Sequence, residues 1–134
     1  MRQVKAIIER ASDGTFSIYM DADNMTYLVT GTGSTVEEAR KVFNDGYEDM
    51  KQYYAEEKKA FEEVEFIFQY DVASFLQYYA FAFSLAGLER ITGINQKQLG
   101  HYVSGYRNPS PKTKQKIEES IHKFCEELSA VSFA

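Results

Sequence analysis

The chain has 134 residues, with 20 acidic and 15 basic side chains and a formal net charge of −5 at pH 7. Its 44% hydrophobic and 26% charged residues are typical of a globular protein and not of a disordered one. No apolar run approaches the roughly 20 residues of a membrane span, and the amino terminus lacks the pattern of a secretory signal. A single cysteine, Cys125, cannot form a disulfide framework. These features predict a cytoplasmic protein without membrane association.

The charges are unevenly distributed along the chain. Residues 1–70 carry 14 acidic and 8 basic side chains, whereas residues 71–134 carry 6 acidic and 7 basic ones. Within the second region, residues 90–116 contain six basic side chains and no acidic one. An acidic total argues against nucleic acid as a partner, because phosphates need a positive surface. The division by region instead predicts two domains, residues 1–70 and 71–134, with different partners.

Residues 1–70 predict an α+β domain of order β-β-β-α-β. Short apolar or alternating runs predict four strands, over residues 4–9, 16–20, 27–30 and 64–70. Asp13-Gly14 between the first two runs favours a tight hairpin turn. Ser34, with Glu37 three residues later, predicts a capping box and a helix that continues to about Lys59.

Residues 71–134 predict helices throughout, with caps at regular intervals. The expected amino-terminal caps are Asp71, Ser84, Asn95 and Ser110. Gln98 would complete a capping box with Asn95, and glycines would end two helices, at Gly93 and Gly105. The last helix is expected to bury one apolar stripe, formed by Ile117, Ile121, Phe124 and Leu128.

The two short helices around Gly93 have helix-turn-helix spacing, and from here the sequence resembles the repressor-type, Cro-like DNA-binding domains. The resemblance spans residues 85–128 and is carried by Thr92-Gly93-Ile94-Asn95 at the turn, by Leu99 and Tyr102, and by the segment from Gly105 to Ser110. Glu89 departs from the pattern, which usually has a small residue there. The resemblance implies operator DNA as a partner, and a homodimer or higher homo-oligomer that spans two half-sites.

Inward-facing Leu99, Tyr102 and Val103 would leave the opposite side of that helix to Gln96, Lys97, Gly100, His101 and Ser104. By resemblance, five residues would face the major groove: Asn95, Gln96, Lys97, Gln98 and His101. Three more would lie near the DNA backbone: Arg107, Asn108 and Lys112. Gly100 either lets the helix approach DNA or is a tolerated weak point, costing about 1 kcal/mol relative to alanine. The alternative to a DNA-binding surface is a helical bundle with a solvated basic face.

The domain combination resembles the HicB family of toxin-antitoxin antitoxins. Three segments carry the amino-terminal part of the resemblance: residues 15–20, 34–40 and 64–68. The resemblance implies a reduced ribonuclease-H-like domain that masks a small basic mRNA-cleaving toxin (HicA-like), and a second domain that represses the shared operon. An acidic surface is what the mask of a basic protein needs.

Two other functions remain as alternatives. A stand-alone transcriptional regulator would use the first domain for dimerisation or ligand sensing. A nuclease of the reduced fold would need converging carboxylates, but the middle of the first strand holds Ile7 and Ile8. We therefore predict a protein that is not an enzyme and binds no cofactor or metal.

Two residue groups are expected to serve packing. Cys125 lies three residues after His122, but with so few further ligands a core thiol is the expectation. The dense aromatic residues from Phe66 to Phe83 are expected in the core, the alternative being a stacking platform for single-stranded RNA.

Overall fold

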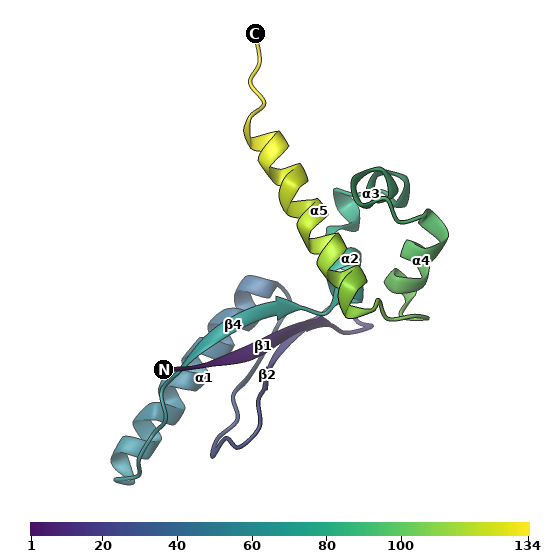
Figure 1. Cartoon of the computed structure of the whole chain (residues 1–134). Coiled ribbons are helices and arrows are strands. Elements are labelled where there is room, and N and C mark those ends of the chain that lie inside the picture. Colours follow the sequence, from purple (N-terminus) through teal and green to yellow (C-terminus); the bar gives the residue numbers. More distant parts are fainter. The chain divides into compact units, whose positions relative to one another are not determined.

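Residues 1–71 are the first of the two units into which the chain divides, and they form a four-stranded sheet with one long helix. The structure is a computed structural model that describes all 134 residues. The elements of this unit are β1 (Arg2–Arg10), β2 (Phe16–Asp21), β3 (Thr30–Gly33), α1 (Val36–Glu56) and β4 (Val64–Tyr70). The strand order is β3-β2-β1-β4, with β4 parallel to β1 and the other neighbours antiparallel. Figure 1 shows β2, β1 and β4 side by side. The chain therefore belongs to the α+β class.

Alternation along the strands produces the core of this unit. Every second side chain of β1 and β2 is buried: Val4, Ala6, Ile8, Phe16, Ile18 and Met20. The parallel register places Val4 beside Phe66, and α1 contributes Phe43, whose ring meets Phe66 edge-on at a centroid distance of 4.8 Å. The apolar face of α1 and one face of the sheet thus form a single core.

The third strand lies at Thr30–Gly33, so the predicted strand at residues 27–30 is wrong by about three positions. Tyr27 and Val29 are buried, as the alternating pattern indicates, but they precede the hydrogen-bonded ladder with β2. The ladder forms where the chain has glycine. A Cβ atom at Gly31 would lie 2.3 Å from the carbonyl oxygen of Ala39, so only glycine allows β3 to approach α1 this closely.

The start and the end of α1 also differ from the prediction. Thr35 and not Ser34 caps the helix, since the Glu38 N–H donates to Thr35 Oγ1 at 3.1 Å. The returning bond runs from Ser34 N–H to Glu38 Oε2 at 3.2 Å, so the acidic partner is Glu38 rather than Glu37. The helix ends at Glu56, short of the predicted Lys59, because Lys58 adopts a left-handed conformation with φ of 56°.

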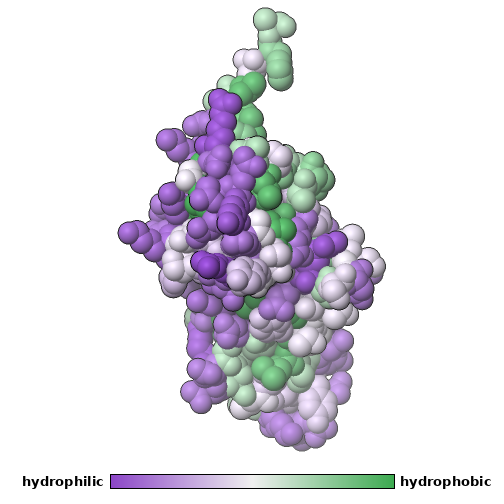
Figure 2. Space-filling model, turned by 90° about the vertical axis from the view of Figure 1, so that its right-hand side faces the viewer, coloured by the Kyte–Doolittle hydropathy of each residue, from purple (hydrophilic) through white to green (hydrophobic).

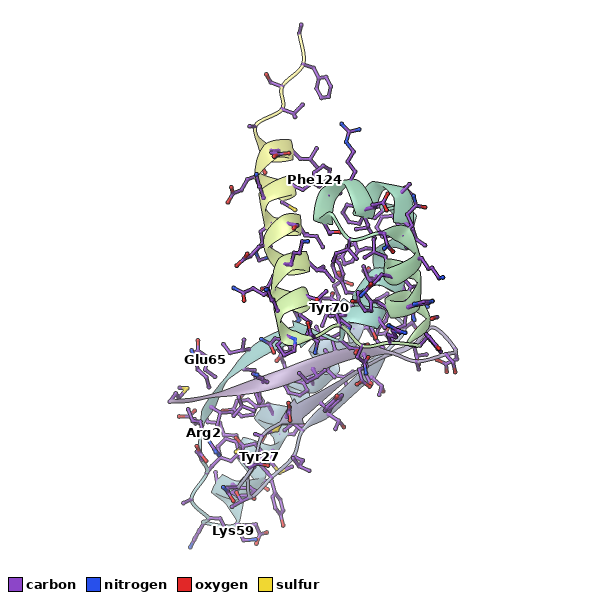
Figure 3. All side chains as sticks on the ribbon, turned by 45° about the vertical axis from the view of Figure 1, so that its right-hand side comes forward. Arg2, Tyr27, Lys59, Glu65, Tyr70 and Phe124 are labelled. Atoms are coloured by element: carbon purple, nitrogen blue, oxygen red, sulfur yellow. The ribbon has the colours of Figure 1, made fainter.

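An aromatic cluster joins the end of α1 to the segment before β4, and it contains Tyr27, which is labelled in Figure 3. The Tyr27 ring stacks on Phe61 at 4.6 Å and meets Tyr54 edge-on at 6.0 Å. The Tyr27 hydroxyl donates to the Glu62 carbonyl oxygen at 2.6 Å. Burial, together with the neighbouring Tyr47 and Glu62, raises the pKa of Tyr27 to about 12, so the hydroxyl stays a donor throughout the neutral range.

Residues 72–134 form the second unit, which is entirely helical. Its elements are α2 (Val72–Tyr78), a 3₁₀ turn η1 (Tyr79–Phe81), α3 (Leu85–Thr92), α4 (Gln96–Ser104) and α5 (Pro111–Ser129). Its core contains Leu76, Leu88, Leu99, Tyr102 and Ile117. Across both units, none of the helices combines the length and the apolar character needed to cross a membrane.

Local cap rules confirm most of the helix ends in this unit. The side chains of Ser84, Asn95 and Ser110 accept amino-terminal N–H bonds, as predicted. Gly93 and Gly105 end α3 and α4 with φ of 75° and 79°, the left-handed conformation that favours glycine.

The predicted buried stripe of α5 is only partly correct. Ile117 is buried, and Ile121 and Phe124 are half-buried, but Leu128 is 55% exposed. Cys125 is exposed as well, so its assignment as a core thiol is wrong. The stripe continues along α5 beyond the helices that cover its first turns, and its far end remains in solvent.

Replacing Gly31 with alanine should destabilise the first unit by about 1–3 kcal/mol or more, because the new methyl group would overlap the α1 backbone. Thr32→Ala, at an exposed position of the same strand, serves as the matched control and should change stability by less than about 0.5 kcal/mol. Urea unfolding followed by tyrosine fluorescence measures both. Equal midpoints for the two variants would contradict the close approach of β3 to α1.

Candidate nucleic-acid interface

The turn between α3 and α4 is held by backbone and side-chain hydrogen bonds together. The Gly93 N–H donates to the Glu89 carbonyl oxygen at 2.7 Å. Thr92 is buried, donates from Oγ1 to the Leu88 carbonyl at 2.7 Å and accepts from the Ile94 N–H at 3.2 Å. A buried threonine with both partners satisfied fixes the angle at which α4 leaves α3.

Two side chains cap the amino terminus of α4. Asn95 Oδ1 accepts from the Gln98 N–H at 2.9 Å, and Glu89 Oε1 accepts from the Gln96 N–H at 3.1 Å. Glu89 therefore does not obstruct the packing of α3 on α4, but ties the two helices together. The predicted capping box is incomplete, because the Gln98 amide donates to the Tyr102 hydroxyl at 2.6 Å.

The carboxyl end of α4 is fixed from a third helix. Gln77 of α2 donates from Nε2 to the Val103 carbonyl oxygen at 2.7 Å. That carbonyl belongs to the last turn, whose acceptors have no partner within the helix. Neither Gln77 nor Glu89 was expected from the sequence, since a cap supplied by another helix leaves no local pattern.

Burial of Leu99 and Tyr102 determines which side of α4 faces outward. Lys97, His101 and Ser104 follow one another at helical spacing on the opposite side. Lys97 and Ser104 are exposed and His101 is half-buried. These residues form the outward face of α4.

Gly100 does not belong to this outward face, which corrects the sequence interpretation. A Cβ atom at Gly100 would lie 3.8 Å from Leu85 Cδ1, an ordinary van der Waals contact. The position therefore faces the start of α3. It leaves room for a methyl group.

Tyr106 extends the outward face into the loop after α4. Its side chain is 71% exposed, and its ring lies between the His101 ring at 5.0 Å and the Arg107 guanidinium carbon at 5.9 Å. An exposed ring beside two cationic or aromatic groups can contact a sugar or a base. The signal for it was its place in the segment from Gly105 to Ser110, but it was not among the predicted site residues.

The six basic residues of the second unit's acid-free window are all exposed: Arg90, Lys97, Arg107, Lys112, Lys114 and Lys116. None of them takes part in a salt bridge, whereas in the first unit ion pairs join Arg2 to Glu62, Lys41 to Asp45 and Lys51 to Glu63. Their charge is therefore available to an anionic partner.

The eight predicted site residues fall into three groups. His101 and Arg107 are brought together around Tyr106, and Lys97 lies one turn before His101 on α4. The side chains of Asn95 and Gln98 are engaged in hydrogen bonds within α4. The remaining three are exposed: Gln96, Asn108 and Lys112.

In the first unit, Glu9 near the end of β1 is hydrogen-bonded to Tyr19. The Tyr19 hydroxyl donates to Glu9 Oε1 at 2.8 Å, and this hydrogen bond, with burial, raises the pKa of Tyr19 to about 12. No group of three or more His, Cys, Asp or Glu side chains in the structure is placed to hold a metal ion.

Comparison of the chain with protein-family models, with curated proteins and with solved structures gave no match.

Replacing Gly100 with alanine should stabilise the second unit by about 1 kcal/mol, because alanine favours the helix and the site has room for its methyl group. Thermal unfolding measures the change, with Gly105→Ala as a destabilising control at a positive φ. If Gly100 faces α3, DNA affinity should not fall. A loss of affinity in the stabilised variant would place Gly100 against DNA instead.

Proposed function

We propose that residues 72–134 bind duplex DNA as a helix-turn-helix of the repressor type, with α4 in the major groove. The observation that carries this proposal is the set of six basic side chains of the acid-free window, which are all exposed and form no salt bridge. Phosphates are bound by such charges, and base edges by side chains on the inserted helix.

The proposed role of each site residue follows from the contacts of its side chain. Lys97 and His101 lie on the outward face of α4, and Gln96 is exposed at its start. These three are therefore the proposed base-reading residues. Asn95 and Gln98 hold the helix itself and are positioning residues. Arg107, Asn108 and Lys112 are proposed to contact phosphates, which set the register without reading sequence.

We further propose that the first unit is the toxin-binding part of a HicB-like antitoxin. Its order β-β-β-α-β agrees with the reduced ribonuclease-H-like domain that the sequence resembles. Its excess of acidic side chains supports a small basic mRNA-cleaving toxin as the partner. The whole protein would then be a cytoplasmic binding protein without catalysis, which neutralises the toxin and represses its own operon.

DNA binding is tested by a shift assay on the promoter of the protein's own operon. Lys97→Ala and Arg107→Ala should each weaken binding by roughly tenfold. In Arg107→Ala, the slope of log affinity against log salt concentration should also become shallower by about one unit, because one phosphate contact is lost. Lys123→Ala is the matched control, because Lys123 is an exposed lysine of the same unit outside the acid-free window. An equal loss of DNA affinity in the control and the test variants would contradict the proposed orientation of α4.

Toxin binding is tested by co-expression with the product of the adjacent reading frame, which should be short and basic. Neutralising two exposed acids of α1, in Glu48→Gln/Asp49→Asn, should slow association several-fold at low salt, because the acidic surface steers the basic partner. Glu118→Gln/Glu126→Gln in α5 changes the net charge equally and should have little effect. A neighbouring protein that does not bind at all would leave a stand-alone regulator as the remaining function.

A further inference from the structure

Glu89, in the last turn of α3, is bonded at two points to the turn that leads into α4. Its backbone carbonyl oxygen accepts from the Gly93 N–H at 2.7 Å, and its side-chain Oε1 accepts from the Gln96 N–H at 3.1 Å. Both bonds together fix the carboxylate beside the first residue of α4. A side chain that is held in place in this way loses little further freedom when a ligand binds to it.

The second oxygen of this carboxylate has no partner within the protein. Oε2 of Glu89 forms no hydrogen bond, and Glu89 forms no salt bridge, although Arg90 is its neighbour in the chain. Glu89 is half-buried and Gln96 is exposed, so the place is open to a ligand. Since a carboxylate accepts hydrogen bonds at both of its oxygens, Oε2 can accept one from outside the protein.

The position of this oxygen matters because α4 is the helix proposed to enter the major groove. The side of the second unit that carries α4 in Figure 1 faces the viewer in Figure 2, where hydrophilic residues predominate. Gln96 and Lys97, at the start of α4, are exposed and are proposed to read bases. Because Glu89 is bonded to the backbone of Gln96, its carboxylate would approach the same base edges.

We propose that Glu89 is a specificity-determining residue, whose Oε2 accepts a hydrogen bond from the amino group of a cytosine. This inference rests on the proposed DNA binding. In the major groove, cytosine presents an amino group at N4 and adenine at N6. The adenine amino group lies between two acceptors, its own N7 and O4 of the paired thymine, whereas the cytosine amino group has an acceptor on one side only, O6 of the paired guanine. Acceptors repel a carboxylate, so cytosine is the favoured base.

The negative charge of Glu89 also acts against the wrong bases. Thymine presents O4 to the major groove, and guanine presents O6 and N7, so either base would place an acceptor opposite Oε2. Phosphates flank the groove and repel the carboxylate further wherever no donor compensates for it. Specificity arises from such repulsion as much as from a favourable contact. Glu89 stands where the repressor-type pattern usually has a small residue, so this preference is not part of that pattern.

The inference is tested by selecting duplexes that the full chain binds from a random-sequence pool. The wild type should select a cytosine at one position of the site, and exchange of that C·G pair for T·A should weaken binding by roughly tenfold. In Glu89→Gln, the amide oxygen can keep the cap on the Gln96 N–H, while the amide nitrogen presents donors in place of Oε2. This variant should bind the T·A site at least as well as the C·G site. Its thermal unfolding midpoint should equal that of the wild type, because the cap is kept.

Glu118→Gln is the matched control, because it removes the same charge from an exposed position of α5 and should select the same cytosine as the wild type. If the wild type and Glu89→Gln select the same base at every position, the role of Glu89 is overturned while the proposed DNA binding stands. If the wild type binds no duplex of the pool, the proposed DNA binding fails, and this inference fails with it.

Discussion

The burial of Leu99 and Tyr102 in the second unit's core is the interaction on which the candidate interface depends. Both side chains come from α4, and their burial leaves Lys97 and His101 on the outward face. Caps from other helices hold the two ends of α4, through Glu89 and Gln77. The helix is thus fixed on one side and at both ends before any ligand binds. A rigid support of this kind lowers the entropy that binding must overcome.

The two units use their charges differently. Acidic side chains of the first unit that have a basic neighbour form exposed ion pairs, such as Lys41 with Asp45, which contribute little to stability. The six basic side chains of the acid-free window form none. Unpaired charges of one sign repel one another, so their arrangement favours recognition of an oppositely charged partner over stability of the fold.

The parts of the fold that follow local rules were predicted well from the sequence. The caps at Ser84, Asn95 and Ser110 depend on side chains within a few residues, and alternation indicated the buried positions of β1 and β2. The errors arose where distant segments decide. Gly31 sets the place of β3 through α1, and the length of the neighbouring helices decides how much of the α5 stripe is buried. The capping roles of Glu89 and Gln77 lacked any local signal, because each side chain acts on a helix other than its own.

The carboxylate of Glu89 changes what the amino terminus of α4 can do. A helix amino terminus usually attracts phosphate through its free N–H groups, but here Glu89 already accepts from Gln96 N–H. In the proposed complex with DNA, the phosphate contacts would then be made by the separate lysines and arginines of the window. Each such contact releases a counterion, so the affinity of one subunit should fall with salt by about one power per bound phosphate. Under the proposed function, occupancy of an operator would thus respond to the number of subunits bound together more than to the strength of any one helix.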